Sequence, residues 1–214
     1  MSTEYHIRFR DLIEIKGDNT VSVIGCGSIG SYVAKNLVKL GVTYLDMYDM
    51  DNVAEENIGT QDYNHSDIGE FKALALARSL NKMKRGLVIR PHIKRITSDS
   101  KLDSEVVFSC VDSMSARRDV FNVVNRSIST RFLIDVRMAI GILHIIVIPN
   151  TPIEMRNYDD FYLFDDRVAL QEPCTNKATG YCAMVGAGLA ISYYVDALKS
   201  NINKLYAKSF TLGV

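Results

Sequence analysis

The sequence predicts an α/β fold, in which a mostly parallel sheet carries helices on both faces and ends in antiparallel strands. Apolar strand-like runs alternate with amphipathic helical patterns from residue 20 to residue 136, which is the order expected of a parallel sheet. A further apolar run, RMAIGILHIIVI at 137–148, follows the previous strand directly. So short a connection favours an antiparallel pair.

Length and composition fit one domain over residues 1–214, with an N-terminal segment at 1–18. The 25 basic residues balance the 25 acidic ones, so charge gives no reason to expect nucleic acid or an anionic membrane as a partner. The start, MSTEYHIRFRD, has no apolar signal-peptide core. The apolar stretches near 138–148 and 181–198 are too short or too interrupted to span a bilayer. We therefore expect a soluble, cytoplasmic protein.

The strands are expected where apolar runs are bounded by turn residues. Their ranges are 20–25, 42–49, 87–94, 105–111, 131–136, 137–148 and 203–212. The run EVVFSCV has no polar alternation and predicts a strand that is buried on both faces.

The helices are expected between these strands, after a short N-terminal element and a turn at 17–19. The element and the helices span 3–15, 28–40, 67–83, 113–128 and 178–199. Gly41 stands just past the first helix, and Asp67 and Glu70 are spaced as a capping box for the second. The acidic, aromatic residues 150–175 predict a loop or crossover over one face.

A glycine-rich loop joins the first strand to the first helix in a Rossmann-like arrangement. The sequence GCGSIG begins at Gly25, which allows the tight turn, and Gly27 lets the backbone approach a phosphate. Gly30 lets the helix pack closely on the strand. The helix N-terminus at Ser28 and Ile29 favours an anion. The loop predicts a nucleotide site, and a glycine turn without a ligand is the alternative.

Acidic residues end the second strand, in the order Tyr48-Asp49-Met50-Asp51. An acid about 20 residues past such glycines suits the hydroxyls of an adenosine ribose. NAD and ATP fit this feature equally well. Asp51 alone could as well be a solvated loop acid or a cap.

The polar loop that follows favours a triphosphate over a dinucleotide. Breaking an α–β phosphate bond requires cations and amide donors on the triphosphate, and a carboxylate for magnesium. Asn57 and Gln61 could supply the amides, and Lys72 could reach the phosphates, unless it is a solvated helix lysine. Asp112 follows a buried strand, where α/β sheets bind ligands. It could hold Mg²⁺ or cap the next helix, a role for which Ser113 competes.

The motif order GxGxxG, DxD, NxxxQ, DIGxxKA and CxDS resembles the ThiF/MoeB and ubiquitin-activating (E1-type) adenylyltransferase superfamily over roughly residues 20–135. The resemblance implies an ATP- and Mg²⁺-dependent enzyme that adenylates the C-terminal carboxylate of a small ubiquitin-like or sulfur-carrier protein ending in Gly-Gly. It implies that Asp49 binds ribose, that Asn57, Gln61 and Lys72 contact ATP, and that Asp112 is the magnesium-side acid. No C-x-x-C pair occurs, so a compact, zinc-free prokaryotic or phage-like member is the nearer match.

One position departs from the family pattern, because Thr60 stands where the family has an arginine. A neutral residue there weakens the stabilisation of phosphate charge. Arg137, or Arg8 or Arg10 from a partner's N-terminal segment, could substitute. The alternative is a weak or inactive member that serves as a scaffold or dimer partner. An NAD(P)-dependent oxidoreductase is a third reading, which rests on the glycine loop alone.

The stretch from Glu172 to Lys199 resembles the C-terminal helix of the family, which often follows a cysteine in a Cys-Thr pair. Cys174 follows a proline, and the next helix N-terminus and Lys177 would favour its thiolate. It could accept the acyl group as a thioester or act in sulfur transfer, and a passive loop cysteine fits as well. The other cysteines, Cys26, Cys110 and Cys182, are expected to pack.

A homodimer is also expected, partly by analogy with the family. The apolar, small-residue helix at 181–198 and the hairpin-like segment 131–148 could supply the contacts. The sequence does not identify the carrier or the fate of the acyl-adenylate.

Overall fold

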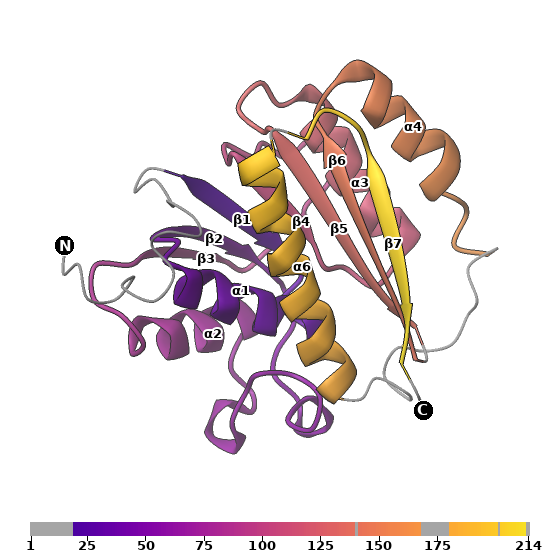
Figure 1. Cartoon of the computed structure of the whole chain (residues 1–214). Helices are drawn as coiled ribbons and strands as arrows, with labels where there is room; N and C mark the ends of the chain where they lie inside the picture. Colours follow the sequence, from indigo (N-terminus) through magenta and orange to yellow (C-terminus); the bar gives the residue numbers. More distant parts are fainter. Residues whose placement is uncertain (1–18, 140, 168–179, 201, 213–214) are drawn as a thin grey trace.

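A computed structural model of the chain describes residues 19–139, 141–167, 180–200 and 202–212. Its centre is a seven-stranded sheet in the order β3-β2-β1-β4-β5-β6-β7 (Figure 1). The strands are β1 (Thr20–Ile24), β2 (Tyr44–Tyr48), β3 (Val88–His92), β4 (Val106–Ser109), β5 (Phe132–Ala139), β6 (Ile142–Pro149) and β7 (Tyr206–Thr211). Strands β1 to β5 are parallel, and β6 and β7 are antiparallel to their neighbours. The expected fold class is confirmed.

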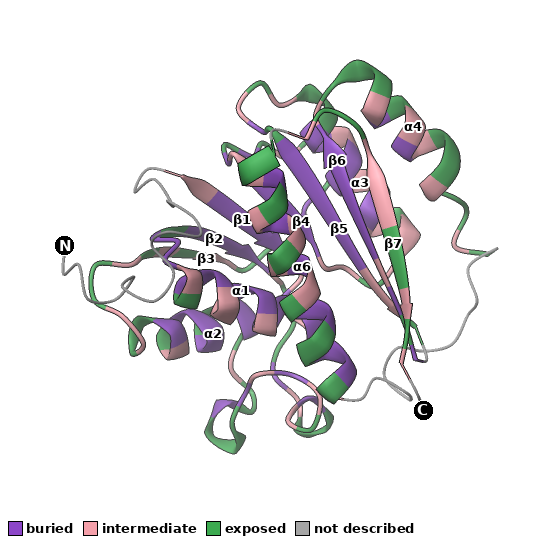
Figure 2. Ribbon diagram, in the orientation of Figure 1, coloured by how far each residue is buried: buried purple, intermediate pink, exposed green. Residues whose placement is uncertain are grey.

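Helices cover both faces of the sheet, as the alternating pattern predicts. The helices are α1 (Ser28–Leu40), α2 (Lys72–Asn81), α3 (Met114–Arg126), α4 (Pro152–Tyr162) and α6 (Gly180–Ser200). Helices α1, α2 and α6 lie on one face, and α3 and α4 lie on the other (Figure 1). Two apolar cores result, one on each face. Figure 2 shows the central strands almost wholly buried.

The strand order creates a crevice at one edge of the sheet. From β1 the chain passes through α1 to β2 on one side, whereas β4 pairs with β1 on the other side. At such a reversal the loops after the two central strands diverge, and ligands bind between them. The loop after β1 carries the glycines, and the loop after β4 carries Asp112.

The start of the second helix differs from the prediction. Residues His65–Asp67 form a short 3₁₀ turn, and α2 begins only at Lys72. Gly69 has φ 87°, a left-handed conformation that stops the turn from continuing into the helix. The predicted capping box therefore does not cap α2. Asp67 is buried instead and forms an ion pair with Arg78 at 2.5 Å.

Part of the predicted crossover loop is a helix, which corrects the interpretation of residues 150–175. Helix α4 begins after Thr151, whose side chain accepts a hydrogen bond from the Glu154 amide at 3.4 Å. Pro152 occupies the first turn, where its missing N–H costs nothing. The local sequence Thr-Pro-x-Glu contains both helix-start signals.

The turn between the two hairpin strands lies further along the chain than expected. Strand β5 continues to Ala139, and Gly141 (φ 63°) makes the turn into β6. Both strands lie inside the sheet between β4 and β7. They therefore offer a partner little surface beyond their turn.

Helix α6 is long and apolar enough to cross a membrane by length and composition, contrary to the expectation for 181–198. In the structure it packs on α1 and against β5 and β6. Gly186 makes this approach possible, because a Cβ there would lie 2.9 Å from a Leu143 methyl. Core helices of globular proteins meet the same length and composition test.

Candidate functional site

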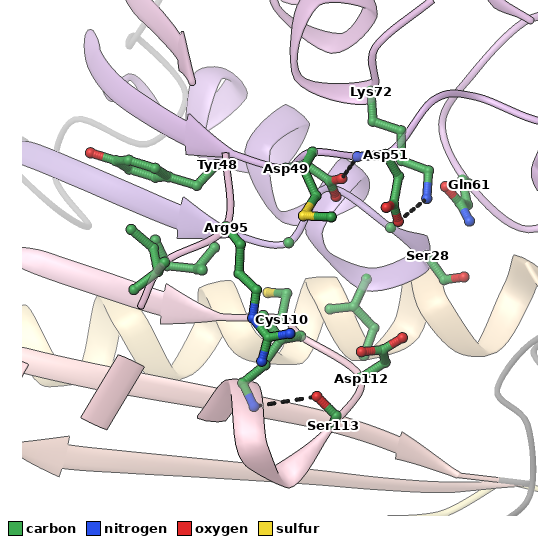
Figure 3. Close-up of a pocket in the computed structure, with 18 of the residues that line it drawn as sticks. Ser28, Tyr48, Asp49, Asp51, Gln61, Lys72, Arg95, Cys110, Asp112 and Ser113 are labelled. Carbon is green, nitrogen blue, oxygen red and sulfur yellow. Dashed lines mark hydrogen bonds and ion pairs between the residues drawn. The ribbon is translucent and has the colours of Figure 1, made fainter. Parts of the chain in front are cut away.

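A cavity of about 440 Å³ opens at the carboxyl ends of β1, β2 and β4 (Figure 3). All the residues predicted to bind nucleotide line it, with the exception of Gly30: Gly25, Gly27, Ser28, Ile29, Asp49, Asp51, Asn57, Gln61 and Lys72. Asp112 and Thr60 line it as well. Residues spread over some ninety positions of the sequence are thus brought to one place, as the motif order predicts.

The three glycines have the geometry that their predicted roles require. Gly25 has φ 88°, and a Cβ there would lie 2.8 Å from the carbonyl oxygen of Cys110. A Cβ on Gly30 would lie 1.8 Å from the carbonyl oxygen of Gly25, so this glycine permits close helix–strand packing. A Cβ on Gly27 would meet no atom within 4 Å, because this side faces the cavity. A phosphate could approach the backbone there.

The N-terminus of α1 is open to an anion. Within the described part of the chain, no side chain caps it, and its first turn holds no acid. The first amides of a helix have no partner inside the helix and carry its positive dipole end. Gly27, Ser28 and Ile29 line the cavity here. The site therefore has an anion-binding end made of backbone.

Asp49 joins the glycine loop to the end of β2. One carboxylate oxygen accepts a hydrogen bond from the Cys26 amide at 2.7 Å, and the other accepts one from the Asp51 amide at 2.8 Å. Burial raises the pKa of Asp49, and the two backbone hydrogen bonds oppose that effect. Each oxygen can accept another hydrogen bond. The carboxylate could thus hold ribose hydroxyls in the cavity.

Lys72 is a fixed residue of the cavity wall. It is only 8% exposed, and its Nζ lies 3.2 Å from a carboxylate oxygen of Asp51, whose side chain is 62% exposed (Figure 3). The Lys72 amide also donates to the Asp51 carbonyl at 2.9 Å. The alternative of a solvated helix lysine is therefore wrong. Asp51 orients the ammonium group, which a triphosphate could then share.

The two amide residues of the polar loop have different tasks. Asn57 accepts a hydrogen bond from the Ala54 amide at 2.9 Å, which orders the loop. Gln61 is buried, and its Oε1 has no hydrogen-bond partner among the described residues. Such a group costs free energy unless a ligand or water satisfies it. Gln61 also lines the cavity, so a ligand or water bound there could satisfy this oxygen.

Asp112 faces the cavity without serving as a helix cap. Ser113 caps α3, since its hydroxyl accepts a hydrogen bond from the Ala116 amide at 3.3 Å. Asp112 is exposed at the cavity edge. Among the described residues there is no cluster of three or more His, Cys, Asp or Glu that could enclose a metal ion. A single carboxylate suits Mg²⁺ that takes its other oxygens from phosphates and water.

Three cationic residues of the wall are not among those predicted from the sequence: Lys94, Arg95 and Arg117. Arg95 extends from the loop after β3, and one of its terminal nitrogens lies 3.6 Å from an Asp119 oxygen (Figure 3). Lys94 lies over the Tyr48 ring at 5.8 Å. Their position at the carboxyl end of a parallel strand was the signal available. Arg117 had no such signal, because it lies within a helix.

The structure does not bring every candidate to the cavity. Arg137 is absent from its wall, and its guanidinium donates to Asp135 at 2.6 Å and to the Tyr162 carbonyl at 2.9 Å. Arg137 is therefore not placed to substitute for the arginine that the family has at position 60. It does not supply positive charge to the wall beside Thr60. Arg8, Arg10, Cys174 and Lys177 lie outside the described residues.

Two of the three described cysteines are buried as expected, whereas Cys110 also lines the cavity. Cys26 and Cys182 are buried, and Cys110 is half-buried. Burial raises the pKa of Cys110 to about 12 and also raises the pKa of Cys26. A thiol that stays protonated is a poor nucleophile.

The ThiF family model matches residues 13–212. A curated relative, the NEDD8-activating enzyme E1 catalytic subunit of Dictyostelium discoideum, is 32% identical over 108 residues, or 49% of this chain and 24% of the relative. The chain thus spans about a quarter of that relative's length.

Solved structures show the same fold at low sequence identity. PaaA has a TM-score of 0.73 at 14% identity, with 99% of this chain and 75% of PaaA covered. The E. coli tRNA N6-threonylcarbamoyladenosine dehydratase TcdA, solved with AMP, has a TM-score of 0.68 at 17% identity. Here 94% of this chain and 97% of TcdA are covered.

Proposed function

This chain belongs to the ThiF family, and from that premise we propose that it is an ATP-dependent adenylyltransferase. One observation carries the proposal. Asp49, Lys72, Gln61 and Asp112 line the same cavity as Gly27, where a Cβ would meet no atom within 4 Å. This set suits a nucleoside triphosphate, with a carboxylate for ribose, backbone amides and an ammonium for phosphates, and a second carboxylate for the metal.

The proposed reaction is the attack of a substrate carboxylate on the α-phosphorus of ATP. A bond forms between a carboxylate oxygen and the phosphorus, and the bond from the phosphorus to the bridging oxygen breaks, so that pyrophosphate leaves. The amides at the start of α1 and the Lys72 ammonium would stabilise the negative charge of the phosphates. Mg²⁺, when bound through Asp112, would neutralise charge on the leaving group.

The substrate that we propose is the C-terminal carboxylate of a small ubiquitin-like or sulfur-carrier protein ending in Gly-Gly. The Dictyostelium relative is named as a NEDD8-activating enzyme, which supports a ubiquitin-like protein as the substrate class. We also propose a homodimer. Transfer of the acyl group to Cys174 would be a later step, and it stays a prediction from the sequence.

A second candidate function is a nucleotide-binding scaffold without catalysis. The observation in its favour is Thr60, a neutral residue in the wall where the resemblance implies an arginine. An oxidoreductase has no comparable support.

Calorimetric titration tests nucleotide binding by the purified chain. Mg²⁺-ATP should bind, NADH should release no binding heat, and Asp112→Ala should weaken Mg²⁺-ATP binding by about tenfold, or ~1.4 kcal/mol. The exposed Asp160→Ala on α4 is the matched control and should bind as the wild type does. Binding of NADH in place of ATP would contradict the proposal, and so would full affinity in Asp112→Ala.

A further inference from the structure

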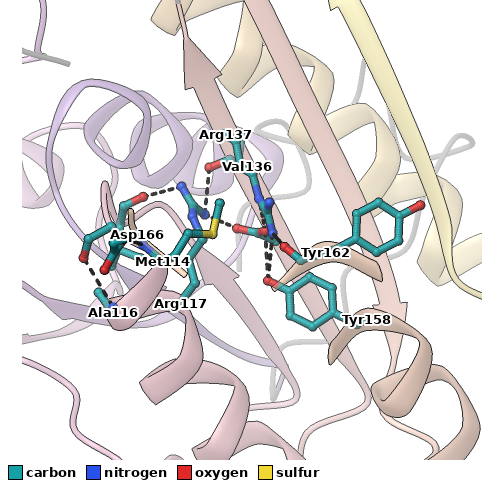
Figure 4. Close-up of polar contacts among 11 residues, drawn as sticks. Met114, Ala116, Arg117, Val136, Arg137, Tyr158, Tyr162 and Asp166 are labelled. Atoms are coloured by element: carbon teal, nitrogen blue, oxygen red, sulfur yellow. Dashed lines mark hydrogen bonds and ion pairs between the residues drawn. The ribbon is translucent and has the colours of Figure 1, made fainter. Parts of the chain in front are cut away.

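A buried ionic cluster lies beside the cavity, on the α3 and α4 face of the sheet (Figure 4). Its centre is Asp135 of β5, which is 0% exposed. Arg117 of α3 donates to one oxygen of this carboxylate. Arg137 donates to the other at 2.6 Å, and the Tyr158 hydroxyl of α4 donates to that same oxygen at 2.9 Å. One carboxylate thus holds two guanidinium groups.

The cluster carries an excess of positive charge. Burial alone would raise the pKa of Asp135, but Arg117 and Arg137 outweigh burial and hold this pKa below its ordinary value, so the carboxylate is ionised. Among the described residues, neither arginine has an ion pair with any other acid. Buried ionic groups give little net stability compared with apolar ones. A role in positioning would account for the cluster better than stability does.

Arg117 extends from this cluster to the loop that holds Asp112. Its Nη2 donates to the carbonyl oxygen of Val111, the residue directly before Asp112, and its Nη1 lies 3.4 Å from the carbonyl oxygen of Val136. Arg117, Val111 and Val136 all line the cavity. The guanidinium therefore fixes the peptide plane that leads into Asp112.

A second contact holds the same loop from its other end. The carboxylate of Asp166, which follows α4, accepts hydrogen bonds from the Met114 amide at 2.6 Å and the Ser115 amide at 3.0 Å. Figure 4 shows Asp166 and Arg117 together near the start of α3. Asp112 and Ser113 are thus bracketed by two polar contacts, one on the preceding carbonyl and one on the following amides.

We propose that Arg117 is a positioning residue for Asp112. By holding the Val111 carbonyl, Arg117 orients the Asp112 carboxylate toward the metal-bound phosphates. This inference rests on the proposed function. Asp135 locks the guanidinium, and the guanidinium locks the Val111 carbonyl. A lysine could not replace it, because one ammonium group cannot reach three acceptors in a fixed plane as a guanidinium can.

The test compares two ligands, of which only one engages Asp112 through a metal. Arg117→Lys keeps the positive charge and removes the planar guanidinium with its several N–H donors. It should weaken Mg²⁺-ATP binding on the order of tenfold, while the affinity for AMP without Mg²⁺ stays near that of the wild type. Arg118→Lys is the matched control, because Arg118 is the next residue of α3 and pairs with Asp159 at the surface. It should change neither affinity.

A second variant covers the case in which Arg117→Lys fails to fold. Asp166→Asn weakens the other contact with the same loop and leaves the buried cluster intact. It should shift Mg²⁺-ATP affinity in the same direction by a smaller factor, with AMP affinity unchanged. If both ligands lose affinity equally, or if neither loses affinity, the positioning role of Arg117 is overturned, but the proposed function is not. A wild-type chain that binds AMP but not Mg²⁺-ATP would overturn the proposed function as well.

Discussion

Thr60 is the residue whose side chain departs most from what the chemistry of the cavity requires. It lies in the wall together with Gln61 and Lys72, the residues that we propose to contact the triphosphate. In the described part of the wall the cations are Lys72, Lys94, Arg95 and Arg117. Lys72, Arg95 and Arg117 already have carboxylate partners. The phosphates would therefore meet less positive charge than the family pattern supplies.

Replacing this threonine tests that deficit. Thr60→Arg should raise the affinity for Mg²⁺-ATP by about tenfold, because a charge-assisted hydrogen bond contributes roughly 1.5–3 kcal/mol and some of that is lost in ordering the side chain. Calorimetric titration measures the change. Thr60→Gln, which is long and neutral, is the control. An equal gain in both variants would show that charge at this position is not what limits binding.

Single residues with a local signal could be predicted from the sequence, and those with distant partners could not. Lys72, Asp49 and Asp112 follow strands or motifs whose spacing fixes their place at one sheet edge. Arg117 acquires its role from Asp135, eighteen positions away on another element. Sequence spacing does not predict which residue of a helix will contact which residue of a later strand. The ionic cluster is therefore recognised only in the structure.

Element boundaries were predicted well where caps and strand ends agree. Helix α1 was predicted at its observed bounds, and Gly41 takes the left-handed conformation expected after it. Helix α2 was predicted too early, because the glycine that breaks the turn lies inside an otherwise helical pattern. Helix α4 was missed, because its aromatic and acidic composition suggested a loop.

We expect the exposed face of α6 to form the interface with a second copy of the chain. Met184 is 52% exposed and Val185 is 41% exposed on this helix. Light scattering at micromolar concentration should give twice the mass of the chain, and Val185→Glu should reduce it to one copy, because burying a charge at an interface is costly. Ile153→Glu, on α4 across the sheet, should leave the dimer intact. A wild-type monomer would contradict the expectation.

The overall architecture of the molecule follows from the alternation of strands and helices along the chain. That alternation predicted the parallel sheet, and the short connection after β5 predicted the antiparallel end. The strand order was not predicted, yet it places the glycine loop and Asp112 on either side of one crevice. The cavity is thus a consequence of the topology, and its chemistry is a consequence of which residues end the strands.

ATP–pyrophosphate exchange is the measurement that most directly tests the adenylation of a protein carboxylate. The chain should catalyse exchange with Mg²⁺ and at least one of a panel of ubiquitin-like and sulfur-carrier proteins ending in Gly-Gly. The same carrier without its two terminal glycines should give none. Asp112→Asn should lower the rate by about a hundredfold or more, in the range seen when one electrostatic group is removed from an active site. Exchange that is absent with every carrier, although Mg²⁺-ATP binds, would contradict the enzyme and favour the scaffold.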